Sequence, residues 1–471
     1  MTVKWIPGPD LPPPSLETGV WGWLKKNLFS SVPNTVLTLL GIFFIVATVP
    51  PFVRWAFLNA TWLGETREAC TCMAEDAPGA CWVFIKVRLG MFMYGFYPEA
   101  ERWRVNLTLL FFALGMLPIL LHDRLARGKA ETGLAVLSAI IVFMLFGGIA
   151  GSVAALFFLG PFGLSRTDFS GLFAAADGRR IRRAGPLLSG VLVCVAAVRF
   201  AESGAGSIAA SVTLLLMFGT LIRKASVRTW QWIFLFCIYP FIAYHLLMGD
   251  AFGLPFVDTH MWGGMFLTLV IAGIGIATSL PIGILLALGR RSEMTAVRTL
   301  CVCFIELIRG VPLISVLFMA SVMLPLFLPE GTQFNKLLRA LIGVALFYAA
   351  YMAEVIRGGL QAMPKGQYEA AEALGLGYWR MMGLVILPQT LRLVIPGIVN
   401  TFLGLFKDTT LVAVIGLMDM LGIVKTALAD TEWLGFPKEA YVFAAAVYWI
   451  FCFGMSRYSM YLEGRFQVKR R

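Results

Sequence analysis

The sequence predicts an all-α polytopic membrane protein, and three of its properties support this fold class. Of its 471 residues, 59% are hydrophobic and only 14% are charged. Its mean hydropathy is +0.79. Apolar runs long enough to cross a hydrocarbon layer of about 30 Å recur along the chain. Since every backbone polar group inside lipid must be satisfied within the protein, these runs are expected to form helices.

Twelve apolar runs are candidate transmembrane helices. They lie at 34–56, 105–122, 131–147, 149–165, 184–200, 206–222, 230–248, 264–288, 299–327, 337–357, 391–427 and 440–461. The stretch 131–165 could form one long tilted helix or two short ones that turn at Gly147, Gly148 and Gly151. If the basic cluster at 179–183 and the C-terminal tail are both cytoplasmic, this stretch crosses twice. The chain then has about twelve transmembrane helices, within a range of eight to twelve, and both termini are cytoplasmic.

Lysine and arginine orient these helices. The net charge is +12, which in a soluble chain would suggest a nucleic-acid partner. In this apolar chain, basic cytoplasmic loops account for the charge, and no nucleic-acid partner is expected. The connections expected in the cytoplasm hold Arg124, Arg127 and Lys129; Arg179, Arg180, Arg182 and Arg183; Arg223, Lys224 and Arg228; Arg290 and Arg291; and Lys469 to Arg471. The loop 57–104 mixes both signs and is expected to be the main extracytoplasmic loop.

Residues 1–33 are predicted to form a cytoplasmic tail and an interfacial helix. Pro7, Pro9 and the proline run 12–14 interrupt the tail, which is too polar for a secretory signal peptide. After them, tryptophans at 21 and 23 beside lysines at 25 and 26 are typical of a helix that lies among the lipid headgroups.

Three of the eight cysteines share one polar loop. Cys70, Cys72 and Cys81 lie in the loop 57–104, whereas the others are scattered through apolar segments without metal-ligand spacing. One local disulfide among the three is expected if the loop faces an oxidising space, and free thiols are the alternative.

Charged and polar side chains lie within or at the ends of the apolar segments mainly in the second half of the chain, and the first half has almost none inside its runs. Those of the second half are Glu306, Arg309, Glu354, Arg357, Asn400, Lys407, Asp408, Thr409 and Thr410. Because ionisable groups at membrane depth cost several kcal/mol unless they are paired or hydrated, they are candidates for a substrate path. We therefore predict a boundary near residue 255, with an accessory membrane region at 34–255 and a transport core at 256–471.

Two interpretations of these charges stay open. A zwitterionic amino acid needs both an anionic and a cationic partner: Glu306, Glu354 and Asp408 could bind its ammonium group. Arginines 309 and 357 and lysine 407 could bind its carboxylate. Alternatively, Glu306 with Arg309, and Glu354 with Arg357, are spaced i, i+3 and pair with each other.

The segment 363–388 cannot cross the membrane because four charged residues interrupt it, and the topology places it in the cytoplasm. Pro364 and Gly366 break the preceding helix, residues 367–374 favour a helix of about two turns, and Gly375 ends it. One side of this helix holds Tyr368, Ala371, Glu372 and Gly375. Such a helix could enter a groove on another protein, or it could be an ordinary loop helix.

The sequence contains no motif for nucleotide hydrolysis. Gly128-Lys129 is followed by Ala130 and lacks the upstream glycine of a phosphate-binding loop. The histidines at 122, 245 and 260 stand apart from one another, so no catalytic grouping or metal site is expected. This chain is therefore predicted not to be an enzyme and to hold no cofactor of its own.

The pattern Glu369-Ala370-Ala371, three residues, Gly375, nine residues, then Val385-Ile386-Leu387-Pro388 resembles the EAA loop of permease subunits from bacterial binding-protein-dependent ABC importers. Val385 stands where isoleucine is usual. The resemblance implies a five-helix type I permease core whose coupling helix enters a cleft of the ATP-hydrolysing subunit. The residues implied to couple are Glu369, Ala370, Ala371, Gly375 and Pro388.

The same resemblance implies the partners and the location. These are a dimer of ABC ATPase subunits that binds ATP and Mg²⁺, a second related permease subunit and an extracytoplasmic amino-acid-binding protein. The chain itself would be a multi-pass protein in the lipid of the bacterial inner membrane.

Flanking segments narrow the resemblance. FIELIRGVPL (304–313), AEVIRGGL (353–360), PKGQYEAAEALG (364–375) and NTFLGLFKDTTLV (400–412) resemble polar amino-acid permeases of the histidine and glutamine type. The loop at 81–104 is similar to that of the M-type permease of the general L-amino-acid system. The region 149–248 departs from that pattern in being longer and more apolar.

A secondary transporter driven by an ion gradient is the alternative function, since twelve helices and internal carboxylates would suit it. Such proteins usually show two similar halves, and this sequence shows no internal repeat. The substrate range does not follow from the sequence.

Overall fold

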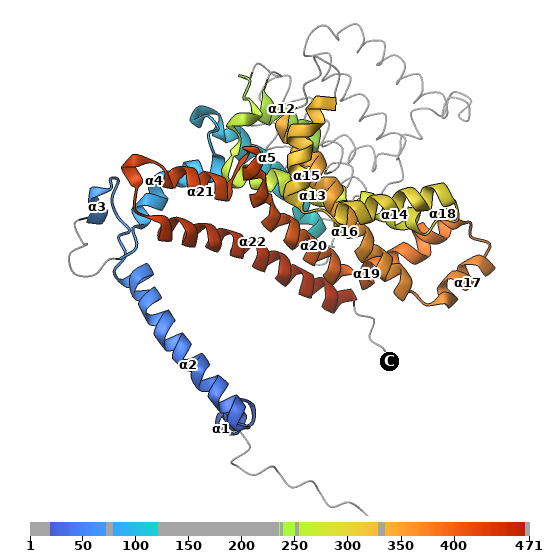
Figure 1. The fold of residues 1–471 in the computed structure, drawn as a ribbon, viewed down its shortest axis with the longest axis horizontal. Coiled ribbons are helices and arrows are strands. Elements are labelled where there is room, and N and C mark those ends of the chain that lie inside the picture. Colours follow the sequence, from blue (N-terminus) through green and yellow to red (C-terminus); the bar gives the residue numbers. More distant parts are fainter. Residues whose placement is uncertain are drawn as a thin grey trace, which may run out of the picture. The chain divides into compact units, whose positions relative to one another are not determined.

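The computed structural model describes residues 19–71, 79–120, 235, 239–249, 254–327 and 335–466. Most of these residues are helical (Figure 1). The crossings predicted between 131 and 222 lie outside the described residues. The chain divides into two compact units, one made of residues 1–90 and 424–451 and the other of residues 91–423 and 452–471.

Five described helices are long and apolar enough to cross a membrane. They are Val32–Leu58, Gly264–Arg290, Lys336–Ala362, Ile395–Ile415 and Pro437–Arg465. A sixth candidate is the bent pair Thr295–Arg309 and Leu313–Met323. If the bent pair is one span, it and the four helices after residue 260 are five candidate crossings in the described part of the C-terminal region, the number that the five-helix core prediction requires.

The first unit begins with two helices. α1 spans Gly19–Asn27, where the sequence predicts an interfacial helix. The Ser31 hydroxyl then accepts a hydrogen bond from the Asn34 N–H (3.4 Å) and caps α2, Val32–Val53. None of the residues of α2 is buried in the structure, and its surface is apolar on every side, as expected of a helix that contacts lipid.

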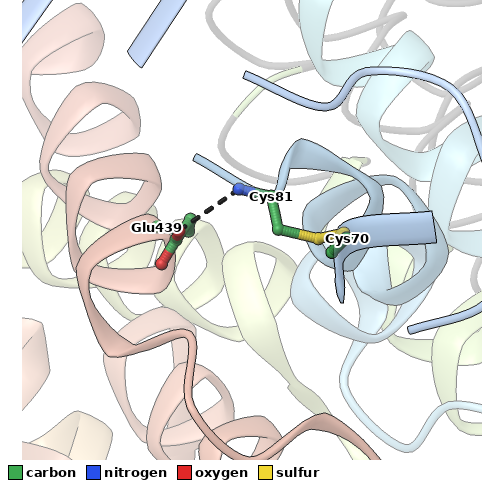
Figure 2. Close-up of a disulfide and its surroundings, with 3 residues drawn as sticks. All are labelled: Cys70, Cys81 and Glu439. Carbon is green, nitrogen blue, oxygen red and sulfur yellow. Dashed lines mark hydrogen bonds between the residues drawn. A yellow bond between two sulfur atoms is a disulfide. The ribbon is translucent and has the colours of Figure 1, made fainter. Parts of the chain in front are cut away.

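The polar loop of the first unit contains a disulfide between Cys70 and Cys81, one of the arrangements that the sequence left open. Cys72 lies outside the described residues. The disulfide connects the end of the short helix α3, Glu68–Thr71, to the residue before α4, Trp82–Tyr94. Figure 2 shows that Cys81 is also held on its other side, because its backbone N–H donates to the Glu439 carboxylate at 3.2 Å.

Glu439 lies in the first turn of α22, Pro437–Phe466, and is only 6% exposed. Two further contacts join the same two segments. Arg88 forms an ion pair with Asp430, and the Phe84 ring packs 5.5 Å from that of Trp433, centroid to centroid. The polar loop and α4 are thus fixed to the start of α22 and the residues just before it by a buried hydrogen bond, an ion pair and aromatic packing.

The second unit includes a buried arginine. The Arg104 side chain is 0% exposed at the start of α5, Arg102–Leu120, where it lies 2.6 Å from the Glu101 carboxylate and donates to the Pro255 carbonyl. Nearby, the Tyr97 hydroxyl donates to the Leu247 carbonyl at 3.0 Å, at the end of α12, Tyr239–Met248. Burial raises the pKa of Tyr97, which favours the neutral hydroxyl that donates this bond.

The centre of the second unit is the packing of α13, Gly264–Arg290, against α16, Lys336–Ala362. Small residues let the two helices approach closely: a Cβ atom added to Gly283 would lie 2.7 Å from the Met352 Cβ. A buried apolar cluster fills the ends of α13 and α16 and includes Leu288, Ile356 and Leu360.

Two expected helices are interrupted. The run 299–327 was expected to be one crossing, but α14, Thr295–Arg309, and α15, Leu313–Phe318, meet at 105°. Pro312 accounts for the break, because proline and the residue before it disfavour a continuous helix. The run 391–427 divides at Gly416 (φ +77°), which separates α20, Ile395–Asp408, and the 3₁₀ helix Thr409–Ile415 from α21, Met420–Leu428.

Candidate functional site

The segment 363–388 folds into short helices outside the long ones. α17 spans Lys365–Ala373, and α18 (Tyr378–Met381), the π-helix Met382–Ile386 and α19 (Leu387–Leu393) follow it. Pro364 stands at the N-cap of α17, and Gly375 follows its C-cap with φ +69°. A helix of about two turns therefore lies where the sequence predicts one, with Pro364 before it and Gly375 after it. It begins two residues earlier than predicted, so that Gly366 lies inside it. Figure 1 shows α17 beyond the ends of α16 and α19.

The two faces of α17 have different surroundings. Ala371 is 2% exposed and packs with the buried cluster that includes Met381 and Ile386. Tyr368 packs against the same cluster. Glu369, Ala370 and Glu372 are exposed. Tyr368 and Ala371, from the side expected to enter another protein, thus face this chain's own core, and the exposed surface of α17 is acidic.

Side-chain hydrogen bonds also hold this segment. The Arg291 guanidinium donates to the Tyr368 hydroxyl at 3.0 Å, and the Gln389 amide donates to Gln367 at 3.0 Å. An open cavity of about 460 Å³ lies beside α17, lined by Arg291, Leu360, Gln361, Met363, Lys365, Tyr368, Glu369 and Glu372. The helix is therefore attached along one side and borders free space on another.

Four of the predicted substrate-path charges form one cluster with a fifth residue, Arg290. The Arg290 guanidinium donates to Glu306 at 2.9 Å and to Glu354 at 2.8 Å. Glu354 also accepts from Arg357 at 2.8 Å and lies 3.7 Å from Arg309. The Glu354–Arg357 pair is as predicted, whereas Glu306 pairs with Arg290 and Arg309 lies near Glu354. The cluster joins α13, α14 and α16.

The contacts of Arg290 were not predicted from the sequence, in which this residue indicates only the topology. One signal in the sequence could have identified its role. Arg290 follows the end of an apolar run, and Glu306 and Glu354 lie near the ends of two other runs. The cluster contains three arginines and two glutamates, so Glu354, its least exposed member at 15%, has opposite charges close to it.

Asp408 lies apart from that cluster. It accepts a hydrogen bond of 2.5 Å from the hydroxyl of Tyr348, a residue of α16 that is 5% exposed. The hydroxyls of Thr409 and Thr410 donate to carbonyls of their own helix turn, at 2.8 and 2.9 Å. Asn400 and Lys407 are exposed. The structure thus brings Asp408 against α16 and leaves the other predicted polar residues of this stretch in separate environments.

Comparison with known proteins identifies the family. The model of the family described as "Binding-protein-dependent transport system inner membrane component" matches residues 279–468. The inner membrane amino-acid ABC transporter permease protein YhdY of Escherichia coli is 44% identical over 470 residues, which cover 100% of this chain and 99% of the relative. This chain belongs to the amino-acid ABC transporter permeases.

Two further relatives differ in how much of this chain they cover. The glutamate/glutamine/aspartate/asparagine transport system permease protein BztC of Rhodobacter capsulatus is 40% identical over 98% of this chain and 96% of its own length. The glutamate/aspartate import permease protein GltK of Escherichia coli is 32% identical, but its match covers 44% of this chain and 93% of its own length. Nearly all of a shorter permease thus corresponds to less than half of this one.

Membership of this family tests several of the predictions made from the sequence. The chain is the membrane subunit of an ATP-driven, binding-protein-dependent amino-acid importer and a multi-pass inner-membrane protein. It is not an enzyme, since a separate partner hydrolyses ATP. Permeases of this family work with an ATPase subunit and a substrate-binding protein. The alternative of an ion-gradient-driven transporter is not supported.

Proposed function

We propose that α17 is the coupling helix of this permease, and that an ATPase subunit contacts its exposed acidic face. The observation that carries the proposal is the division of the helix into two faces. Ala371 is buried in the permease's own core, while Glu369, Ala370 and Glu372 are exposed. When a partner moves the exposed face of such a helix, the buried face can pass that movement to the buried apolar cluster at the ends of α13 and α16.

The wider assembly in this proposal contains two ATPase subunits, which bind ATP and Mg²⁺, and a second related permease subunit. An extracytoplasmic binding protein delivers the amino acid, and both termini of this chain are cytoplasmic. Residues after about 255 form the transport core, and 34–255 form an accessory region. The match of the family to residues 279–468 supports this division.

Contacts inside the core reduce the number of residues that we propose for the substrate path. Glu306, Arg309, Glu354 and Arg357 have partners within the cluster, so we assign them to holding α13, α14 and α16 together. Asp408, at the end of α20, is then the carboxylate proposed to bind the substrate ammonium, because its partner Tyr348 of α16 is an uncharged hydroxyl and not a cation. Lys407 and the polar residues 400, 409 and 410 remain candidates for the rest of the path.

Acidic and amide L-amino acids are the proposed substrate class. The support is the relative named for glutamate, glutamine, aspartate and asparagine, which aligns with nearly the whole chain at 40% identity. Competition of uptake by acidic, amide, basic and branched amino acids in cells lacking and regaining this chain tests the assignment. Uptake that only basic or branched amino acids inhibit would contradict it.

Substitution Glu369→Lys tests the coupling role in the complete transporter, reconstituted in proteoliposomes with its ATPase and binding protein. Reversal of charge on the exposed face is expected to reduce uptake by more than about tenfold, since charge pairs at an interface contribute several kcal/mol when they are reversed. Glu293→Lys is the matched control, because Glu293 is also exposed but lies between α13 and α14. Normal uptake by the Glu369→Lys transporter at normal expression would overturn the proposal.

A further inference from the structure

Two consecutive arginines end α13, and their side chains contact different parts of the protein. Arg290 donates to Glu306 and Glu354 and so joins long helices to one another. Arg291, the C-cap residue of α13, donates instead to Tyr368 of α17. The end of α13 is thus connected to the core by one arginine and to α17 by the next.

The contact of Arg291 with Tyr368 has three parts. One guanidinium nitrogen donates to the Tyr368 hydroxyl at 3.0 Å and lies 3.4 Å from the Leu360 carbonyl oxygen. The Tyr368 hydroxyl donates to that same carbonyl at 3.3 Å. The guanidinium carbon lies 5.5 Å from the centroid of the Tyr368 ring, within the range of a cation–π contact. Arg291 therefore meets α16 and α17 at one point.

The backbone between α16 and α17 does not fix the direction of α17. Met363 and Pro364 are extended, with ψ of 130° and 136°, so the helical hydrogen bonds of α16 do not continue into α17. The direction of α17 then depends on side-chain contacts, which include the burial of Ala371, the hydrogen bond from Gln389 to Gln367 and the contact between Arg291 and Tyr368. The cavity of about 460 Å³ beside the helix gives it room to tilt when such a contact is lost.

We propose that Arg291 is a positioning residue for energy coupling: it fixes α17 to the end of α13, so that movement of α17 reaches α13 directly. This inference rests on the coupling role proposed for α17. Loss of Arg291 leaves the Arg290 cluster and the packing of α13 on α16 in place, so the permease still folds. α17 then moves α13 less directly, and more ATP is hydrolysed per amino acid transported.

The first test measures ATP hydrolysed per amino acid transported by the complete transporter in proteoliposomes. Arg291→Ala is expected to raise this ratio about fivefold, an effect typical of losing one exposed hydrogen bond and one cation–π contact. Arg291→Lys restores part of the coupling, because an ammonium group can still lie over the ring and donate one hydrogen bond. Tyr368→Phe keeps the ring, loses the hydroxyl and gives an intermediate ratio.

Arg298→Ala is the matched control, because Arg298 is an exposed arginine of α14. It is expected to leave the ratio unchanged. A ratio that rises equally in the control variant would show that any nearby loss of positive charge uncouples the transporter, and would overturn the inference.

A second readout separates positioning from a general loss of stability. Spin labels on Glu293→Cys and Ala373→Cys, in a background without the other free cysteines, report the distance between the end of α13 and α17. Both positions are exposed. The distance distribution is expected to broaden in Arg291→Ala and to return toward the original width in Arg291→Lys. Equal widths in the original and alanine transporters would overturn the inference.

The Glu369→Lys transporter, measured in parallel, separates the two proposals. If Glu369→Lys uncouples the transporter while Arg291→Ala leaves both the ratio and the distance unchanged, only the positioning role of Arg291 fails. If Glu369→Lys leaves uptake normal, the coupling role of α17 fails and the role of Arg291 fails with it. If Arg291→Ala does not yield folded protein, Arg291→Lys and Tyr368→Phe decide the question by the same two readouts.

Discussion

Two polar segments of this permease are held by opposite kinds of interaction. The loop before α4 contains a disulfide and is joined to the first turn of α22 by a hydrogen bond to a buried carboxylate. The helix α17 is held by one buried alanine, by the packing of Tyr368 and by side-chain hydrogen bonds from Arg291 and Gln389. The first set of contacts resists local opening, whereas the second permits a small rotation. We expect only the second segment to move during transport.

The largest effect is expected from removing the carboxylate that joins α13, α14 and α16. Glu354→Ala leaves Arg290, Arg309 and Arg357 close together without the carboxylate that all three approach, and its side chain is only 15% exposed. Breaking such a partly buried pair costs about 3 kcal/mol. We expect a lower unfolding temperature of the purified permease and uptake reduced by more than about tenfold.

Glu293→Ala is the control for Glu354→Ala, since it removes an exposed carboxylate near the same helix ends. If both variants unfold at the same temperature and transport equally well, the cluster does not hold the three helices together.

A smaller effect is expected from disturbing the buried face of α17. Ala371→Leu adds three carbon atoms at a position that is 2% exposed, and overpacking of this kind costs about 1–3 kcal/mol. The helix is expected to be displaced from the core, which raises the ATP hydrolysed per amino acid about threefold while the long helices stay folded. Ala296→Leu, at an exposed position of α14, provides the control for added volume. An unchanged ratio in Ala371→Leu would show that the buried face does not transmit movement.

The same contrast shows which features a sequence can predict. The helix α17 and the Glu354–Arg357 pair follow from neighbours within a few residues, so proline, glycine and i, i+3 spacing were enough. By contrast, Arg290–Glu354 and Tyr348–Asp408 join residues 64 and 60 positions apart, and such pairs depend on how helices pack. Spacing alone also left the disulfide partner of Cys81 open.

Hydrophobic length also hid the break between α14 and α15. The apolar run 299–327 is long enough for one crossing, and this outweighed the proline at 312 that ends the helical hydrogen bonding. The structure shows that the local signal was the better guide.

In the fixed segment, removing the disulfide is expected to change stability more than transport. The bond closes a loop between residues 11 positions apart, and a closure of that size contributes about 2–3 kcal/mol. Cys70→Ser, made together with Cys72→Ser so that Cys72 cannot replace Cys70, should speed trypsin cleavage at exposed Arg67. Uptake should change by less than about twofold, since the segment is not expected to move. Cys303→Ser is the control, because Cys303 is a free and exposed cysteine. If only the double variant loses uptake, this loop moves during transport.

The smallest expected effect separates the hydrogen bond of Glu439 from its charge. Glu439→Gln keeps an oxygen that can accept from the Cys81 N–H, so we expect a loss of less than about 1 kcal/mol. Glu439→Ala leaves a buried N–H without its acceptor, which costs about 1–3 kcal/mol. Thermal unfolding of the two purified variants measures the difference, and uptake should stay within about twofold in both. If glutamine destabilises the permease as much as alanine does, the negative charge in the first turn of α22 stabilises this segment more than the hydrogen bond to Cys81 does.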